Sequence, residues 1–208
     1  MRLTLSMASY QRPQRTMRSI ECITNQNING WEALIVGDGC PFLNEILPTD
    51  ALEPYYAKAE EGGNSLIVEN LLENTGGYGY HIINQNIERA KGQYFIFFAN
   101  DDIILNNHFE NYLSAIEGTD YDFVYFNSNI MGEYTRNSSL NFGQIGHSEL
   151  IIRTDFLKKM PKHIDGYGHD WDLIQNMINA GAKYKKADTH PPTYIVKSLA
   201  NNREQNID

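Results

Sequence analysis

Apolar and polar residues follow two different periods along this chain, one typical of strands and one typical of helices. The apolar run over 94–98 is uninterrupted, as in a strand that is buried on both faces. Over 14–25 apolar residues recur at helical spacing, as at Met17, Ile20 and Ile23. Through about residue 100 the predicted strands (2–8, 31–36, 65–69, 94–98) alternate with predicted helices (14–25, 43–46, 50–60, 81–91). This alternation predicts a mostly parallel sheet.

The second half of the chain is less regular. Its apolar pattern predicts helices over 107–116, 154–160 and 171–180, and strands over 123–127, 149–153, 184–187 and 194–196. Residues 131–142 are polar and irregular, and we predict a surface loop there. A chain of 208 residues is long enough for one sizeable core, so we expect a single domain.

Composition and charge exclude several classes of protein. No apolar run approaches the roughly 18 residues of a membrane helix, and the N-terminus lacks the pattern of a signal peptide. Cys22 and Cys40 are isolated thiols, which fits a reducing compartment, so we expect a soluble cytoplasmic protein. The net charge of -9 argues against a nucleic-acid partner. An acidic protein that binds a nucleotide has to supply a metal or local basic groups.

The sequence Ala99-Asn100-Asp101-Asp102 directly follows the most apolar predicted strand. The carboxyl edge of an open α/β sheet is where a ligand or a metal normally binds, although Asn and Asp also favour caps and turns. On a turn both carboxylates can serve one ion, and oxygen ligands suit Mg²⁺ or Mn²⁺. An added imidazole favours Mn²⁺, and His190, beside two prolines, is a candidate ligand or else a structural histidine.

Two further carboxylates and a glycine-rich segment also fall at predicted strand or helix ends. Asp38 lies between two glycines, where it serves either a ligand or a plain turn. Asp170 precedes a predicted helix that Asp172 is placed to start, so Asp170 either projects into a cleft or caps the helix. The glycines over 76–79 let a backbone approach phosphate or sugar, but they match neither a Walker loop nor the dinucleotide pattern.

Taken together, these stretches resemble the GT-A nucleotide-sugar glycosyltransferases, most closely those of family 2. The resemblance runs in order over about residues 3–182 and rests on the segments SMASYQRP (6–13), IECITNQ (20–26), WEALIVGDG (31–39), ANDD (99–102) and GHDWDL (168–173), together with Asn84, Ala90 and Gly92. The chain departs from the family pattern at four positions, which are Gly37, Ile83, Ala99 and His169. Since Ile83 replaces a usual Arg, phosphate binding should depend more on the metal.

The resemblance implies an α/β fold of the GT-A, Rossmann-like type, with a single domain and a central mixed, mostly parallel sheet flanked by helices. Residues 1–105 would form the nucleotide-binding half and residues 106–208 the acceptor-binding half. Asp170 would be the general base of an inverting reaction, or a contact of the sugar in a retaining one. The metal, Mn²⁺ or Mg²⁺, would be held by Asp101, Asp102 and His190. The nucleotide-sugar would be bound by Ala8, Tyr10, Arg12, Asp38, Gly77, Asn100 and Asp101.

The function implied is metal-dependent transfer of a sugar from a UDP-sugar donor to a glycan or glycoprotein acceptor. The Tyr-rich second half also resembles the N-terminal glycosyltransferase domain by which chloroviruses decorate their major capsid protein. That resemblance implies a viral capsid glycan as acceptor and the host cytoplasm as location. Two alternatives stay open, a nucleotidyltransferase that makes sugar nucleotides and a non-catalytic carbohydrate-binding module. The donor sugar, the anomeric outcome and the oligomeric state stay open too.

Overall fold

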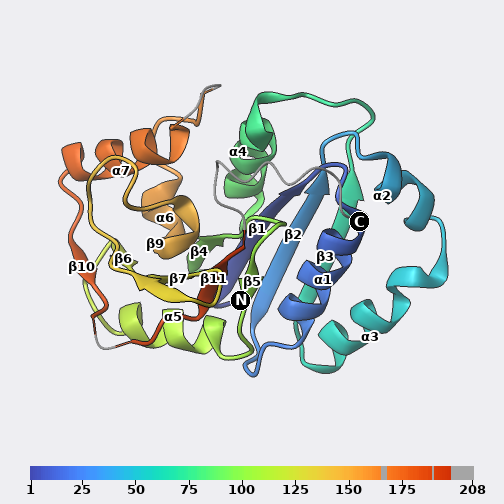
Figure 1. Cartoon of the computed structure of the whole chain (residues 1–208), viewed down its shortest axis with the longest axis horizontal. Coiled ribbons are helices and arrows are strands. Elements are labelled where there is room, and N and C mark those ends of the chain that lie inside the picture. Colours follow the sequence, from blue (N-terminus) through green and yellow to red (C-terminus); the bar gives the residue numbers. More distant parts are fainter. Residues whose placement is uncertain (165–167, 189, 198–208) are drawn as a thin grey trace.

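The computed structural model describes residues 1–164, 168–188 and 190–197. A seven-stranded sheet forms its centre (Figure 1). From one edge to the other its strands are β10 (Tyr184–Lys186), β6 (Phe123–Tyr125), β9 (Leu150–Arg153), β4 (Tyr94–Phe97), β1 (Leu3–Ser9), β2 (Trp31–Gly37) and β3 (Ser65–Asn70). Neighbouring strands are parallel except where β9 pairs with β4 and β6. The predicted mixed, mostly parallel sheet is confirmed.

Helices cover both faces of this sheet (Figure 1). One face packs against α1 (Pro13–Thr24), α2 (Pro41–Ile46), α3 (Glu53–Glu61) and α5 (His108–Ile116). The other face packs against α4 (Tyr80–Arg89), α6 (Thr154–Leu157) and α7 (His169–Asn179). Single 3-10 turns lie at η1 (Asp50–Leu52), η2 (Gly77–Gly79) and η3 (His147–Glu149).

Strand β4 shows why its sequence is apolar at every position. Its side chains alternate between the two faces, so Tyr94 and Ile96 pack in the core under α1 and α5. Phe95 and Phe97 pack in the core under α4, α6 and α7. All four are at most 5% exposed. A strand with a hydrophobic layer on each side has no face left for polar residues, and this explains the uninterrupted run.

A second, four-stranded sheet joins parts of the chain that are far apart in sequence. Its order is β5 (Ile103–Ile104), β11 (Tyr194–Val196), β7 (Ser128–Ile130) and β8 (Tyr134–Arg136). The strand predicted over 123–127 is shorter in the structure, where β6 ends at Tyr125. The separate strand β7 follows it and belongs to the second sheet. The prediction of a loop over 131–142 is wrong in part, because β8 pairs with β7 through a turn at Gly132, whose φ is +81°. An exposed polar edge strand leaves little apolar signal in the sequence.

The fold brings the ends of β1, β2 and β4 to one edge of the large sheet. Asp38 N donates to Ser9 O (2.8 Å), and Phe98 N donates to Ser6 O (2.9 Å), so the segments that follow these strands start side by side. Gly79, with φ +77°, lies so close to β1 that an added Cβ would stand 2.7 Å from the Cβ of Ala8. In the described part of the chain, no helix combines the length and the apolar character needed to cross a membrane.

Candidate functional site

A cavity of about 360 Å³ opens at this edge of the sheet, beside the ends of β1 and β4. Four of the predicted donor-binding residues line it, and they are Ala8, Arg12, Asn100 and Asp101. The other lining residues are Ser6, Ile83, Phe97, Phe98, Ala99, His147, Ser148 and His169. The cavity therefore joins residues of the first half of the chain to residues of the second.

Asp101 is charge-balanced by a basic side chain from the loop that follows β1. Arg12 Nη1 lies 2.7 Å from Asp101 Oδ2 and 3.4 Å from Asn100 Oδ1. Arg18, on α1, donates through Nη2 to the main-chain oxygen of Asp101 (3.3 Å). The Asp101 side chain is 18% exposed and that of Arg12 is 45% exposed, so both are open to a ligand. This acidic protein thus supplies local basic groups next to its acidic turn.

The Asp102 carboxylate is hydrogen-bonded within the protein and is not among the residues that line the cavity. Its carboxylate accepts hydrogen bonds from Tyr194 Oη (2.5 Å) and from Lys197 N (2.8 Å), and the residue is 6% exposed. Burial and the nearby Asp102 charge raise the pKa of Tyr194 well above its ordinary value. Asp102 therefore ties the acidic turn to β11, while Asp101 faces the cavity.

His190 lies in the segment that precedes β11. Its Nδ1 is 2.7 Å from Asn111 Oδ1, on α5, and its ring faces Phe126 at 6.0 Å. Among the described residues no group of three or more His, Cys, Asp or Glu side chains could hold a metal ion. Asp101, Asp102 and His190 therefore do not form a closed metal cage in this structure.

The donor set still fits a divalent cation that is held jointly with a ligand. Mg²⁺ and Mn²⁺ are commonly bound by one or two carboxylates together with substrate phosphates, rather than by an all-protein cage. Asp101 offers one such carboxylate at the cavity. The structure therefore supports a cation shared between Asp101 and a diphosphate better than one bound by the protein alone.

Asp38 is buried and holds the segment that leads into η2. Its carboxylate accepts hydrogen bonds from Thr75 N and Thr75 Oγ1 (both 2.7 Å), from Gly76 N (3.2 Å) and from Asn74 Nδ2 (3.2 Å). Asp38 is 5% exposed and is not among the residues that line the cavity. The structure thus places Asp38 beneath a loop, with its charge already satisfied.

Two other predicted contacts also lie outside the cavity lining. Tyr10 is 40% exposed, and its hydroxyl accepts a hydrogen bond from Gln11 Nε2 (2.9 Å). Gly77 begins η2 and is half-buried, with φ +64°. Both belong to segments that border the β1 end, so a bound nucleotide would have to extend beyond the cavity to contact them.

Asp170 lies inside the first turn of α7, because the helix starts at His169. The predicted start at 171 is wrong, since Gly168, with φ +94°, serves as the residue before the helix. Asp170 Oδ1 accepts a hydrogen bond from Trp171 N (2.8 Å). Its Oδ2 faces Gly146, 3.6 Å from where a Cβ would stand. Asp170 is not among the residues that line the cavity, although its neighbour His169 is.

Sequence reasoning missed a cluster of three histidines at this side of the cavity. His147 Nε2 lies 3.2 Å from His163 Nε2, and the rings of His147 and His169 stack at 5.1 Å. The other face of His147 stacks on Phe97 at 4.6 Å. No motif spacing links these positions, because each histidine comes from a different segment. His147 and His169 line the cavity, and the ring of His163 lies nearly perpendicular to both.

Burial keeps His147 and His163 neutral. Burial, and then the charge of His169, lower the pKa of His163 from 6.5 to about 4. Burial and both neighbouring histidines lower the pKa of His147 well below its ordinary value. A protonated imidazole in this cluster would lose its hydration and would also repel its neighbours.

We predict that this cluster makes the protein less stable in mild acid. The unfolded chain protonates His163 below pH 6.5, whereas the folded chain does so only near pH 4. The contribution of His163 to the free energy of unfolding is therefore fully present above pH 6.5. It is lost as the pH falls from 6.5 towards 4, and it changes no further below pH 4. Between pH 7 and pH 5 this group should cost about 2 kcal/mol. Urea unfolding at the two pH values should show a smaller loss for His163→Gln than for the wild type, and equal losses would contradict the prediction.

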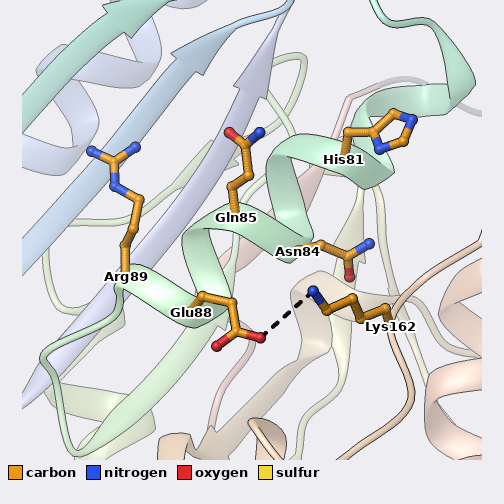
Figure 2. Close-up of a pocket in the computed structure, with 6 residues that line it drawn as sticks. All are labelled: His81, Asn84, Gln85, Glu88, Arg89 and Lys162. Carbon is orange, nitrogen blue, oxygen red and sulfur yellow. Dashed lines mark ion pairs between the residues drawn. The ribbon is translucent and has the colours of Figure 1, made fainter.

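A second hollow, of about 410 Å³, lies on the outer side of α4 (Figure 2). It is lined by His81, Asn84, Gln85, Glu88, Arg89 and Lys162. Several of these side chains already have partners. Lys162 Nζ lies 3.9 Å from Glu88 Oε1, and the Asn84 amide exchanges two hydrogen bonds of 2.9 Å with the main chain of His163. Four of the seven predicted donor-binding residues line the other cavity, which we take as the candidate site.

Comparison with solved structures identifies the fold. The S. aureus TarS 1-349 structure in complex with UDP matches with a TM-score of 0.74 and 16% identity, covering 95% of this chain and 61% of that one. The same protein with UDP-GlcNAc matches at 0.73 and 17%, covering 96% and 59%. The mannosyltransferase PcManGT from Pyrobaculum calidifontis, in complex with GDP-Man and Mn²⁺, matches at 0.71 and 13%, covering 97% and 58%.

The chain therefore has the GT-A glycosyltransferase fold, as predicted. It spans about three-fifths of the length of the TarS 1-349 and PcManGT chains that it matches. No family model and no curated protein matches the sequence. The compared structures come from a bacterium and an archaeon, so they give no support to a viral origin.

Proposed function

We propose that this chain transfers a sugar from a UDP-sugar to a glycan or glycoprotein acceptor. One observation carries the proposal, namely the cavity at the carboxyl edge of β1 and β4, where Arg12, Asn100 and Asp101 converge in a GT-A fold. Ligands of open α/β sheets bind at this edge. TarS in complex with UDP and UDP-GlcNAc, and PcManGT in complex with GDP-Man and Mn²⁺, share the fold.

In this proposal Asp101 holds a divalent cation, Mn²⁺ or Mg²⁺, together with the donor diphosphate. The bound cation would stabilise negative charge on the departing nucleoside diphosphate. Arg12 pairs with Asp101 before any ligand arrives, at 2.7 Å, so its guanidinium is placed to meet phosphate oxygens when the carboxylate takes another partner. We expect Asp102 and His190 to support this region through Tyr194, Lys197 and Asn111 rather than as strong ligands.

In this proposal the two halves of the chain contribute different sides of the cavity. Residues 1–105 supply the β1 and β4 ends and hence the donor side of the cavity. Residues 106–208 supply His147 and His169, which line its other side, and Asp170, which follows His169 in α7. In this arrangement Asp170 accepts the proton of the acceptor hydroxyl as that oxygen attacks the sugar, a role that contributes about 10²–10⁴-fold in rate.

Two alternative functions are less well supported. A nucleotidyltransferase usually has a glycine-rich loop with a basic residue after its first strand, whereas this chain has SYQRP over 9–13. A carbohydrate-binding module needs neither a phosphate-neutralising Arg12 nor a cation-binding Asp101. The pairing of these two residues in one cavity therefore favours transfer.

The proposal is tested by incubating the protein with Mn²⁺ and a panel of UDP- and GDP-sugars and measuring the released nucleotide. Release of UDP from one UDP-sugar, prevented by EDTA, is the expected result. Release of pyrophosphate from a nucleoside triphosphate plus a sugar phosphate would favour the nucleotidyltransferase. If no nucleotide is released but glycans still bind, the carbohydrate-binding module would be the function that remains.

We predict that Asp38 serves nucleotide binding through the loop that it holds. Asp38→Ala removes several charge-assisted hydrogen bonds from Thr75 and Gly76, each worth about 1.5–3 kcal/mol, so UDP should bind at least about tenfold more weakly. Titration calorimetry with Mn²⁺ present measures this affinity. Thr75→Val is the matched control, because it removes one of these bonds and keeps the carboxylate. Weaker UDP binding in both variants supports a role through the loop, whereas an effect of Asp38→Ala alone would mean direct contact with the nucleotide.

A further inference from the structure

An exposed aromatic side chain stands beside the proposed acceptor side of the cavity. Phe142 is 64% exposed, so most of its phenyl ring is open to solvent. Its ring meets that of Trp171 edge to face, with centroids 6.3 Å apart and an interplanar angle of 82°. Trp171 is half-buried and belongs to the first turn of α7. The two rings therefore meet at nearly a right angle at the start of this helix.

The loop that carries Phe142 is fixed by hydrogen bonds within itself. Ser139 Oγ lies 2.9 Å from Gln144 Oε1 and accepts a hydrogen bond of 2.9 Å from Asn141 Nδ2. Gln144 N donates to Asn141 O (3.0 Å), which closes the turn around Phe142. A loop that already has one conformation loses little entropy when a ligand binds.

The base of the same loop is anchored on a buried carboxylate. Glu149 is 1% exposed, and it accepts hydrogen bonds from Ser138 Oγ and Gly146 N, both at 2.7 Å. Arg136 Nη2 lies 2.7 Å from Glu149 Oε1 and balances the charge. Glu149 thereby fixes both ends of the 138–146 segment, and with them the position of Phe142.

The 138–146 segment and Trp171 adjoin Asp170 on two sides. Gly146, at the end of the loop, faces Asp170 Oδ2, and a Cβ there would stand 3.6 Å from it. Trp171 follows Asp170 directly and donates its main-chain N–H to Asp170 Oδ1 (2.8 Å). A ligand resting on Phe142 and Trp171 would therefore have a group within reach of the Asp170 carboxylate.

We infer that Phe142 and Trp171 form a platform for a sugar ring of the acceptor. This inference rests on the proposed function and makes the acceptor a glycan rather than an unmodified polypeptide. The apolar C–H face of a pyranose suits the exposed face of an aromatic ring such as Phe142, with Trp171 beside it, and its hydroxyls suit amides. Asn141 and Gln144 are exposed on either side of Phe142, and Asn141 Oδ1 and Gln144 Nε2 offer an acceptor and a donor. The platform would select the acceptor, and the cavity would select the donor.

The test is binding to an array of immobilised oligosaccharides in the presence of UDP and Mn²⁺. The wild type should bind a subset of these glycans, and Phe142→Ala should bind the same subset about tenfold more weakly. Phe142→Tyr keeps the ring and should bind nearly as the wild type does. Tyr134→Ala is the matched control, because Tyr134 is a 57% exposed aromatic residue on β8 and should not affect binding.

Donor hydrolysis without acceptor, measured on the same variants, separates this inference from the proposed function. Unchanged UDP release from the UDP-sugar by Phe142→Ala, with glycan binding lost, supports the platform. Equal glycan binding by Phe142→Ala and the wild type overturns it, as does a wild type that hydrolyses the donor and binds no glycan. If the wild type releases no UDP from any UDP-sugar, with or without the glycans, the proposed function fails, while Phe142-dependent glycan binding would still support the platform.

Discussion

Replacing Asp101 by Asn should abolish the dependence of UDP binding on Mn²⁺. The side chain keeps its size but loses the charge that a hard cation needs, and the described residues offer no cage of three protein ligands to compensate. Loss of supporting groups around a metal typically costs 10- to 100-fold in affinity, so loss of a direct ligand should cost about 100-fold or more. Titration calorimetry with UDP in Mn²⁺ and in EDTA gives both affinities for each variant.

The pairing with Arg12 adds a second expectation for the wild type. Arg12 occupies Asp101 at 2.7 Å, so Mn²⁺ alone should bind weakly. A diphosphate offers Arg12 a new partner, so Mn²⁺ and UDP should strengthen each other's binding, each to the same extent. Equal UDP affinity in Mn²⁺ and EDTA for the wild type would contradict the role of Asp101.

Asp102→Asn is the matched control for the neighbouring carboxylate. Asp102 accepts hydrogen bonds from Tyr194 and Lys197, so its loss should lower the thermal unfolding temperature and leave the Mn²⁺ dependence in place. His190→Ala should leave the Mn²⁺ dependence unchanged, because its Nδ1 contacts Asn111. A large loss of Mn²⁺ affinity in either variant would restore that residue as a ligand.

The centre of the large sheet could be predicted because strands such as β2, β4 and β9 are buried and have short, strongly apolar sequences. Strand β4 is the clearest case, and its position also predicted where a ligand would bind. The small sheet could not be predicted in the same way. Strand β8 is exposed at Tyr134 and Thr135, and it has only three residues, so no period distinguishes it from a loop.

The candidate site was predictable only where one short segment carries the signal. Arg12, Asn100 and Asp101 belong to loops that follow parallel strands, and such loops converge as a rule. The histidine cluster depends instead on how η3 and the start of α7 pack against β4, which no local sequence pattern reveals. The hydrogen bonds of Asp38 could not be predicted for a related reason, because its partners lie 36 to 38 residues away in sequence.

Replacing Asp170 by Asn should slow sugar transfer by about 10² or more, if Asp170 is the base. Asn keeps an oxygen that can accept the hydrogen bond from Trp171 N, so the start of α7 should keep its structure. UDP-sugar and Mn²⁺ should bind as in the wild type, since the cavity lining includes Arg12 and Asp101 but not Asp170. Transfer rates at saturating donor, together with donor affinity by calorimetry, measure the two effects separately.

Asp172→Asn is the matched control for this substitution. Asp172 is exposed in the same first turn of α7, so its loss removes the same favourable interaction with the helix dipole, about 0.3–1 kcal/mol. Transfer by this variant should stay near the wild-type rate. Near-normal transfer by Asp170→Asn would make Asp170 a residue of the helix start. Lost donor affinity, with a product that keeps the donor's anomeric configuration, would instead place its carboxylate against the sugar in a retaining reaction.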